Sequence, residues 1–230
     1  MQIYAVPSQG YLLESSPKAI NNAKYIHYFC GLNKDKQAIC PNCKSPLYRI
    51  LSLDTSDPRL QLENAPFKYL TLLWCWKCIL SYSKIFSYVI AKDGNISIWQ
   101  YNKHKDISAD FPYKDYPLFF PEVQIELIPV SEQLQELIEK VNDNEVSQSK
   151  ARTENGQIIK PNNQIGGEPY LLHPIMKYLR CKLCNKRMPL FASIGDENTN
   201  SKGFADYEYQ QTLFFYCRNC YVVSAFNQCD

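Results

Sequence analysis

The chain of 230 residues is 45% hydrophobic and 13% aromatic, which is too apolar and too aromatic for an intrinsically disordered protein. Its formal net charge of +2 lacks the large basic surplus that proteins bound to phosphate backbones usually carry, so general nucleic-acid binding is disfavoured. This length suits one large domain or two smaller ones.

The sequence shows no export or membrane signal. Residues 1–17 lack a basic stretch followed by an apolar core, as a secretory signal would have. The most apolar segment, 70–80, has about half of the roughly 20 residues that a spanning helix needs, and Lys77 interrupts it. The sequence therefore predicts a cytoplasmic protein, and in that compartment clustered cysteines more often bind metal than form disulfides.

Before the first cysteine pair, His27 precedes Cys30 by three positions. The two residues could form a spare pair of metal ligands. The favoured interpretation is simpler, namely a buried cysteine next to a surface histidine.

The first half of the chain is predicted to be rich in strands. Short apolar runs at 47–53 and 68–74 are typical of strands. Further along, 85–92 and 96–101 alternate between apolar and polar residues on either side of Asp93-Gly94. An Asp-Gly step between alternating runs predicts a β-hairpin with a tight turn.

A proline-punctuated aromatic segment at 106–130 and a short helix at 131–141 follow. The aromatic segment could form a surface that grips a partner, but we expect a strap packed on the core, because exposing both Phe119 and Phe120 would be costly. Ser131 is the expected N-cap of the helix, whose apolar residues recur at helical spacing.

The second half begins after a polar linker at 142–163. The adjacent glycines Gly166 and Gly167 predict a tight turn where the backbone passes close to another segment. Basic side chains surround the next cysteine pair: Lys177, Arg180, Lys182, Lys186 and Arg187. They could contact nucleic acid, or they could balance the net charge of −2 that four thiolates leave on a divalent ion.

Eight of the ten cysteines form four CxxC pairs, and Cys30 and Cys229 are left over. The pairs are Cys40/Cys43, Cys75/Cys78, Cys181/Cys184 and Cys217/Cys220. Two residues between cysteines let a tight turn present both thiolates to one tetrahedral ion, and two such turns complete a closed four-sulfur shell.

The cysteine pairs repeat with their surroundings. The two pairs of the first half are separated by 32 positions and those of the second half by 33. Residues 40–48 correspond to 181–191, and residues 72–80 correspond to 214–222. The repetition predicts an internal duplication in which each unit closes one ion.

We therefore predict an α+β, mainly β fold made of two duplicated zinc-ribbon-like units with antiparallel strands and a short connecting helix. The first unit spans 1–130 and the second spans 131–230. We expect two structural zinc ions per chain. Zinc binding of about 10–16 kcal/mol in small metal-folded peptides exceeds the usual net stability of a domain, so loss of zinc should unfold a unit.

Several motifs in residues 165–230 follow an order seen in known proteins. They are Gly166-Gly-Glu-Pro, the Cys181/Cys184 pair, Met188-Pro-Leu-Phe-Ala-Ser-Ile, Leu213-Phe-Phe-Tyr-Cys-x-x-Cys and Asn227-Gln228. This order resembles the bacterial YwqG-like family of unknown function, and it is similar to the zinc-bearing N-terminal region of programmed cell death protein 2. Ser193 stands where those proteins usually have glutamine.

The resemblance implies a β-rich fold without an established catalytic centre. It also implies a protein-binding role, either as a dedicated chaperone for a ribosomal protein or in toxin neutralisation. The residues themselves show no Ser-His-Asp or Cys-His series, and closed four-sulfur sites leave no position for catalytic water.

The predicted function is therefore a non-enzymatic, zinc-stabilised module that binds another protein. A nucleic-acid-binding zinc ribbon is the second possibility. A CxxC thiol oxidoreductase is the third, and it is disfavoured because the cysteine pairs are flanked by strand-like residues rather than helix starts.

Overall fold

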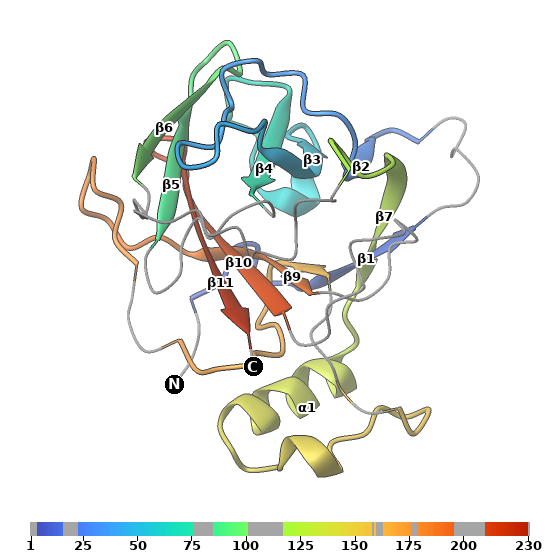
Figure 1. The fold of residues 1–230 in the computed structure, drawn as a ribbon. Helices are drawn as coiled ribbons and strands as arrows, with labels where there is room; N and C mark the ends of the chain where they lie inside the picture. The colour runs from blue at the N-terminus through green and yellow to red at the C-terminus, as the bar shows by residue number, and fades with distance from the viewer. Residues whose placement is uncertain are drawn as a thin grey trace.

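A curled sheet of eleven strands organises the chain in the computed structural model, and one α-helix lies below it (Figure 1). The structure describes residues 4–15, 23–75, 85–100, 117–157, 159, 163–175, 179–195 and 210–229. The strands are β1 (Tyr11–Ser15), β2 (His27–Phe29), β3 (Tyr48–Asp54), β4 (Tyr69–Trp74), β5 (Phe86–Ile90), β6 (Ile96–Gln100), β7 (Val123–Pro129), β8 (Gln164–Ile165), β9 (Leu190–Gly195), β10 (Gln210–Cys217) and β11 (Val222–Cys229). The helices are α1 (Glu132–Asn142) and the 3-10 turns η1 (Pro58–Leu60) and η2 (Gln148–Lys150). This content confirms the predicted α+β, mainly β class.

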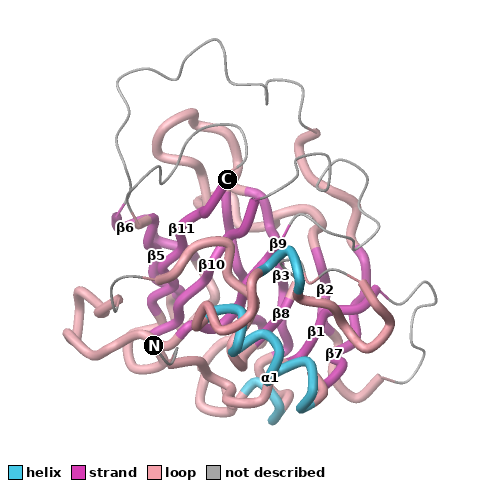
Figure 2. Tube along the Cα trace, turned by 90° about the horizontal axis from the view of Figure 1, so that it is seen from below, coloured by secondary structure: helices cyan, strands magenta, loops and turns pink. Residues whose placement is uncertain are grey.

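All neighbouring strands of the sheet are antiparallel, in the order β4-β3-β2-β7-β1-β8-β9-β10-β11-β5-β6. Strands from the two sides of residue 130 interleave, because β8 pairs with β1 and β5 pairs with β11. In Figure 2, part of the sheet is seen with its strands side by side, from β9 through β10 and β11 to β5 and β6. The expected boundary falls between β7 and α1, and the division into two duplicated units stays a prediction.

The side chain of Tyr88 brings the two ends of the sheet together. Its hydroxyl on β5 donates to the backbone oxygen of Thr71 at 2.8 Å and accepts from the N–H of Leu73 at 2.9 Å, both on β4. Because β4 is one edge of the sheet and β5 is next to the other edge, these bonds require a curled sheet. They also satisfy backbone groups on the outer edge of β4, which no strand covers within the described residues.

Curling explains why β3 is buried along almost its whole length. Five successive residues of its seven, from Ile50 to Asp54, are buried. In a sheet with one solvent-exposed face, buried and exposed residues would alternate along the strand. Leu51 and Leu53 on β3 and Leu70 and Leu72 on β4 have no exposed surface. The main hydrophobic core therefore lies inside the curl and extends across strands from both halves of the chain.

The predicted hairpin is confirmed as β5 and β6. Its turn places Gly94 at a φ of +86°, and the N–H of Gly94 donates to the oxygen of Ala91 at 2.9 Å. The carboxylate of Asp93 accepts the N–H of Asn95 at 3.1 Å. Hydrogen bonds among the residues of the turn therefore stabilise its conformation.

The predicted helix is confirmed as α1. The hydroxyl of Ser131 accepts the N–H of Leu134 at 3.2 Å, which is the expected N-cap bond. Its buried residues, Ile138 and Val141, pack in a small cluster separate from the main core. None of the helices in the described ranges is long and apolar enough to cross a membrane.

The predicted close approach at the glycine pair is also confirmed. Gly166 and Gly167 have φ values of +64° and +58°, which residues other than glycine rarely adopt. A Cβ atom on Gly166 would lie 2.5 Å from the backbone oxygen of Pro7. The turn after β8 therefore lies against the N-terminal segment, and only a hydrogen atom fits between them.

Replacing Gly166 with alanine is expected to destabilise the protein by about 2 kcal/mol more than replacing Gly94. Both positions have positive φ, but a Cβ on Gly94 meets nothing within 4 Å, so Gly94→Ala isolates the backbone strain alone. Urea unfolding of the two variants measures the difference. Equal losses would show that the contact with Pro7 is not tight.

Candidate metal centres

Four cysteines of the second half converge on one point. The Sγ atoms of Cys181, Cys184, Cys217 and Cys220 all lie within 4.8 Å of one another. The first and third are buried, and the second and fourth are half-buried. One pair comes from the turn before β9 and the other from the turn that joins β10 to β11, so the sheet itself brings the two CxxC pairs together.

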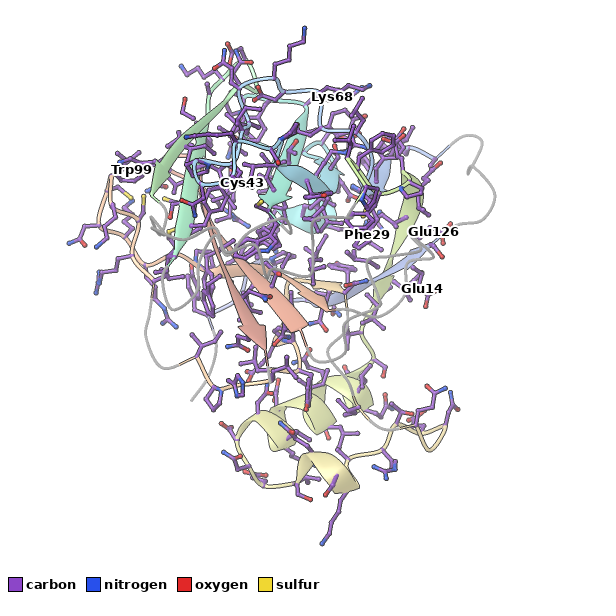
Figure 3. All side chains as sticks on the ribbon, viewed as in Figure 1. Glu14, Phe29, Cys43, Lys68, Trp99 and Glu126 are labelled. Atoms are coloured by element: carbon purple, nitrogen blue, oxygen red, sulfur yellow. The ribbon has the colours of Figure 1, made fainter. Side chains whose placement is uncertain are left out.

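Three cysteines of the first half form a matching cluster. The Sγ atoms of Cys40, Cys43 and Cys75 lie within 4.8 Å of one another. As in the other cluster, the first and third of these cysteines are buried and the second is half-buried. Cys43 is labelled in Figure 3, where it lies beside β4. The expected fourth ligand, Cys78, lies outside the described residues.

The first CxxC pair is held by a hairpin-like turn. The N–H of Cys40 donates to the oxygen of Ser45 at 2.8 Å, and the N–H of Lys44 donates back to the oxygen of Cys40 at 3.0 Å. Lys44 has a φ of +62°, and Ile39 and Pro46 form an isolated antiparallel bridge. The left-handed residue after the second cysteine lets the chain turn back beneath both sulfurs.

The third CxxC pair repeats this turn position by position. The N–H of Cys181 donates to the oxygen of Lys186 at 2.9 Å, and the N–H of Asn185 donates to the oxygen of Cys181 at 2.7 Å. Asn185 has a φ of +59°, and Arg180 and Arg187 form the corresponding bridge. The two turns are thus the same local structure built twice from different sequences.

The fourth CxxC pair also ends on a left-handed residue. Tyr221 has a φ of +55°, and its N–H donates to the oxygen of Cys217 at 2.8 Å. All three CxxC turns in the described part of the chain therefore share a left-handed residue after the second cysteine, whose N–H donates to the oxygen of the first cysteine. This agreement supports a repeated ligand-presenting turn, although the full zinc-ribbon-like duplication remains a prediction.

The sulfur distances match ligands that share one ion. Cys43 and Cys75 are 3.7 Å apart and Cys184 and Cys217 are 3.6 Å apart, and each close pair joins two different CxxC turns. Four sulfurs at about 2.3 Å from a tetrahedral ion would be about 3.8 Å apart. A disulfide would need about 2.05 Å, so these thiols are not bonded to each other.

The thiols of the second cluster differ strongly in acidity. A backbone hydrogen bond from Lys186 lowers the pKa of the Cys184 thiol to about 7. Burial raises the pKa of Cys217 to about 11 and that of Cys220 to about 12. Burial thus opposes ionisation of the full set in the absence of a cation, whereas a divalent ion stabilises four thiolates directly. The donor set therefore fits a metal ion.

Replacing Cys217 with serine is expected to lower the free energy of unfolding by about 4 kcal/mol, because an incomplete sulfur shell cannot hold its ion. Elemental mass spectrometry of the purified variant should show one metal ion per chain fewer than in the parent. The matched control is Cys229→Ser, since Cys229 belongs to neither CxxC cluster. Equal melting temperatures and equal metal contents for the two variants would contradict the ligand assignment.

Two of the described basic side chains near the third CxxC pair, Arg180 and Arg187, make local contacts. Arg180 donates to the backbone oxygen of Asn185 at 3.0 Å, within the cysteine turn itself. The guanidinium of Arg187 lies over the ring of Tyr4 at 5.0 Å. Lys182 and Lys186 are exposed, and both charge balance around the cluster and a nucleic-acid surface stay predictions for these basic residues. Lys177 lies outside the described residues.

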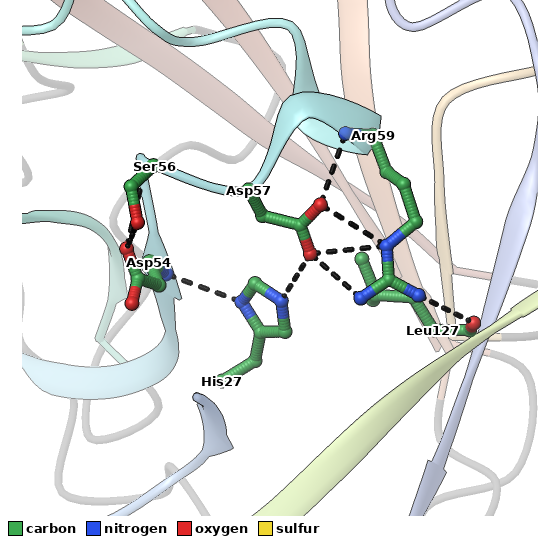
Figure 4. Close-up of polar contacts among 6 residues, drawn as sticks. All are labelled: His27, Asp54, Ser56, Asp57, Arg59 and Leu127. Atoms are coloured by element: carbon green, nitrogen blue, oxygen red, sulfur yellow. Dashed lines mark hydrogen bonds and ion pairs between the residues drawn. The ribbon is translucent and has the colours of Figure 1, made fainter. Parts of the chain in front are cut away.

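His27 is buried, so the expectation of a surface histidine is wrong. Its Nε2 lies 2.8 Å from the carboxylate of Asp57, and its Nδ1 accepts the N–H of Asp54 at 3.1 Å (Figure 4). Both ring nitrogens are therefore in use, and His27 does not form a metal-ligand pair with Cys30. Cys30 is buried, as expected, and belongs to neither cysteine cluster.

The carboxylate of Asp57 is the centre of a buried polar cluster that links β2, η1 and β7. It accepts hydrogen bonds from the guanidinium of Arg59, which also donates to the backbone oxygen of Leu127 at 3.2 Å. Burial alone would raise the pKa of Asp57, but the hydrogen bonds from Arg59 and His27 hold that pKa below its ordinary value. Burial in turn lowers the pKa of His27, so the ring is neutral at neutral pH.

Asp57→Asn is expected to reduce the free energy of unfolding by about 2 kcal/mol, because His27 and Arg59 lose a charged acceptor in a site that water does not reach. Chemical unfolding at neutral pH measures the loss. Glu145→Gln is the control, since Glu145 is exposed. A loss no larger than that of the control would show that the cluster is not important for stability.

Comparisons of the chain with protein-family models, with curated proteins and with solved structures found no match. The resemblance to YwqG-like proteins and to programmed cell death protein 2 therefore stays a prediction. Any functional assignment has to rest on the geometry of the chain itself, and above all on the cysteine clusters and their surroundings.

Proposed function

We propose that this chain is a non-enzymatic, cytoplasmic protein-binding module that two zinc ions stabilise. The ligands of the first ion are Cys40, Cys43, Cys75 and Cys78, and those of the second are Cys181, Cys184, Cys217 and Cys220. Zinc is the proposed metal because it favours closed tetrahedral sites of four thiolates. Such a shell has no open position for water or substrate, which supports a structural role for both ions.

The observation that carries the proposal is a chain of contacts from the first cluster to an exposed apolar segment. Burial, and after it the thiols of Cys75 and Cys43, raise the pKa of Tyr48 above its ordinary value, so this ring lies beside the cluster. The Tyr48 hydroxyl donates to the backbone oxygen of Pro117 at 2.6 Å. Its ring lies 5.3 Å from that of Phe120, which is buried.

Tyr48 holds Pro117 and Phe120 against the protein, and the two residues between them are exposed to solvent. Leu118 is 70% exposed and Phe119 is 44% exposed. The N–H of Gly31 donates to the oxygen of Phe120 at 2.9 Å, which brings the 53% exposed Leu32 close to this segment. The expected packing of the aromatic strap on the core is therefore correct for Phe120 and wrong for Phe119.

Exposed leucine and phenylalanine side chains on a rigid segment favour binding of another protein. The segment is held at both ends, so little conformational entropy would be lost when a partner covers it. The metal cluster contributes by fixing Tyr48, and hence the position of the segment. The metal is thus proposed to act as scaffold for a binding surface.

The double substitution Leu118→Ser with Phe119→Ser is expected to weaken partner binding by at least about tenfold and to leave the melting temperature nearly unchanged, because both side chains are exposed. The partner is first captured with the tagged chain from its source cells and then tested with purified protein. Leu183→Ser is the control, since Leu183 is 56% exposed on the turn of the other cluster. Full binding by the double variant, or equal weakening by the control, would contradict the proposed surface.

A further inference from the structure

A polar cleft lies on the face of β2, β3 and β4, away from the cysteine clusters. Its volume is about 470 Å³, which falls within the range of small-molecule sites. Tyr28, Ser52, Tyr69 and Thr71 line it from the strands. The segment around Asp35 and the turn of the β5–β6 hairpin form its other walls.

Strand register explains why these side chains meet. Tyr28 pairs with Ser52, and Ser52 pairs with Thr71, so the three residues form one row across three strands. Paired residues of antiparallel strands point to the same face, and Tyr69 lies two positions from Thr71 on that face. The result is a row of three hydroxyl groups with a fourth beside it.

These four hydroxyls have no protein partner. Within the described part of the chain, the side chains of Tyr28, Ser52, Tyr69 and Thr71 make no hydrogen bond to another residue. Ser52 is only 5% exposed, so its hydroxyl is deep in the cleft. None of them counts among the buried side-chain atoms without a hydrogen-bond partner, so these hydroxyls are open to water or to a ligand in the cleft.

The charged groups of the cleft are already engaged with the protein. Arg49 pairs with Glu122 and donates through Nε to the oxygen of Cys30 at 2.8 Å. The carboxylate of Asp35 accepts the N–H groups of Gln37 and Ile96, both at 2.7 Å. One cation and two anions are thus held by internal bonds, and Lys34 is exposed at the rim. The strands that line the cleft therefore offer no unpaired charged side chain to an anionic or a cationic ligand.

We propose that this cleft binds a neutral polyhydroxylated ligand, namely a carbohydrate of one or two sugar units. Hydroxyl groups both donate and accept, so a row of them complements the hydroxyls of a sugar ring. The ring of Tyr28 offers an apolar face to its C–H groups, whereas the ammonium group of Lys68 lies over the ring of Tyr69 at 5.2 Å. The lining of the cleft does not include Leu118 or Phe119, although Glu122 and Asn33 bring it close to the segment that exposes them.

The test is an NMR titration of the full, metal-loaded chain with glucose, galactose, N-acetylglucosamine, maltose and cellobiose, each up to about 50 mM. At least one sugar is expected to shift the amide signals of Ser52, Thr71 and Gly94 with saturation. Ser52→Ala and Thr71→Val should each raise the dissociation constant of that sugar by about tenfold. Ser97→Ala is the control, because Ser97 is exposed on β6 outside the cleft.

Three results would overturn the proposal. The first is no saturable shift with any of the five sugars. The second is equal affinity for a sugar in Ser52→Ala and Ser97→Ala, with both variants folded as judged by their melting temperatures. The third is that inorganic phosphate shifts the same amides more strongly than every sugar, since the cleft would then recognise charge. None of these results bears on the surface at Leu118 and Phe119.

Discussion

Four thiols gathered in a partly buried pocket can ionise together only beside a cation, and a matching cluster of three described cysteines lies in the other half of the chain. Each cluster joins a turn before one strand to the end of another, so an ion there would tie together strands that are far apart in sequence. In the second cluster Cys184 and Cys217 are 3.6 Å apart although 33 positions separate them. Burial raises the pKa of Cys217, so the charge of an ion, more than the protein alone, would keep the sulfurs ionised.

The same requirement links structure to the proposed function. Tyr48 lies beside the first cluster and also holds Pro117 by its hydroxyl and Phe120 by its ring. Any movement of the cluster would therefore shift the segment that exposes Leu118 and Phe119. A metal site of this kind has no need of an open coordination position, because its effect on binding would pass through packing and hydrogen bonds.

Two polar features show how the rest of the sheet is used. The cluster around Asp57 is closed, since its carboxylate and both nitrogens of His27 have protein partners, and it stabilises the inside of the curl. The cleft on the opposite side of β2 is open, and among the described residues the hydroxyls of Ser52 and Thr71 have no hydrogen-bond partner. Closed polar groups stabilise the fold, whereas open hydroxyls in a cleft are available to a ligand.

Local chemistry was readable from the sequence. The Asp93-Gly94 hairpin, the helix capped by Ser131 and the close turn at Gly166 are each determined by a few neighbouring residues, and all three are confirmed. The spacing of the CxxC pairs also predicted which thiols would meet in the described part of the chain. Tertiary structure alone decided the pairing of β5 with β11, the burial of His27 and the cleft around Ser52. These features depend on contacts between segments far apart in the chain, where many strand pairings have similar local propensity and only the packing of the whole sheet selects one.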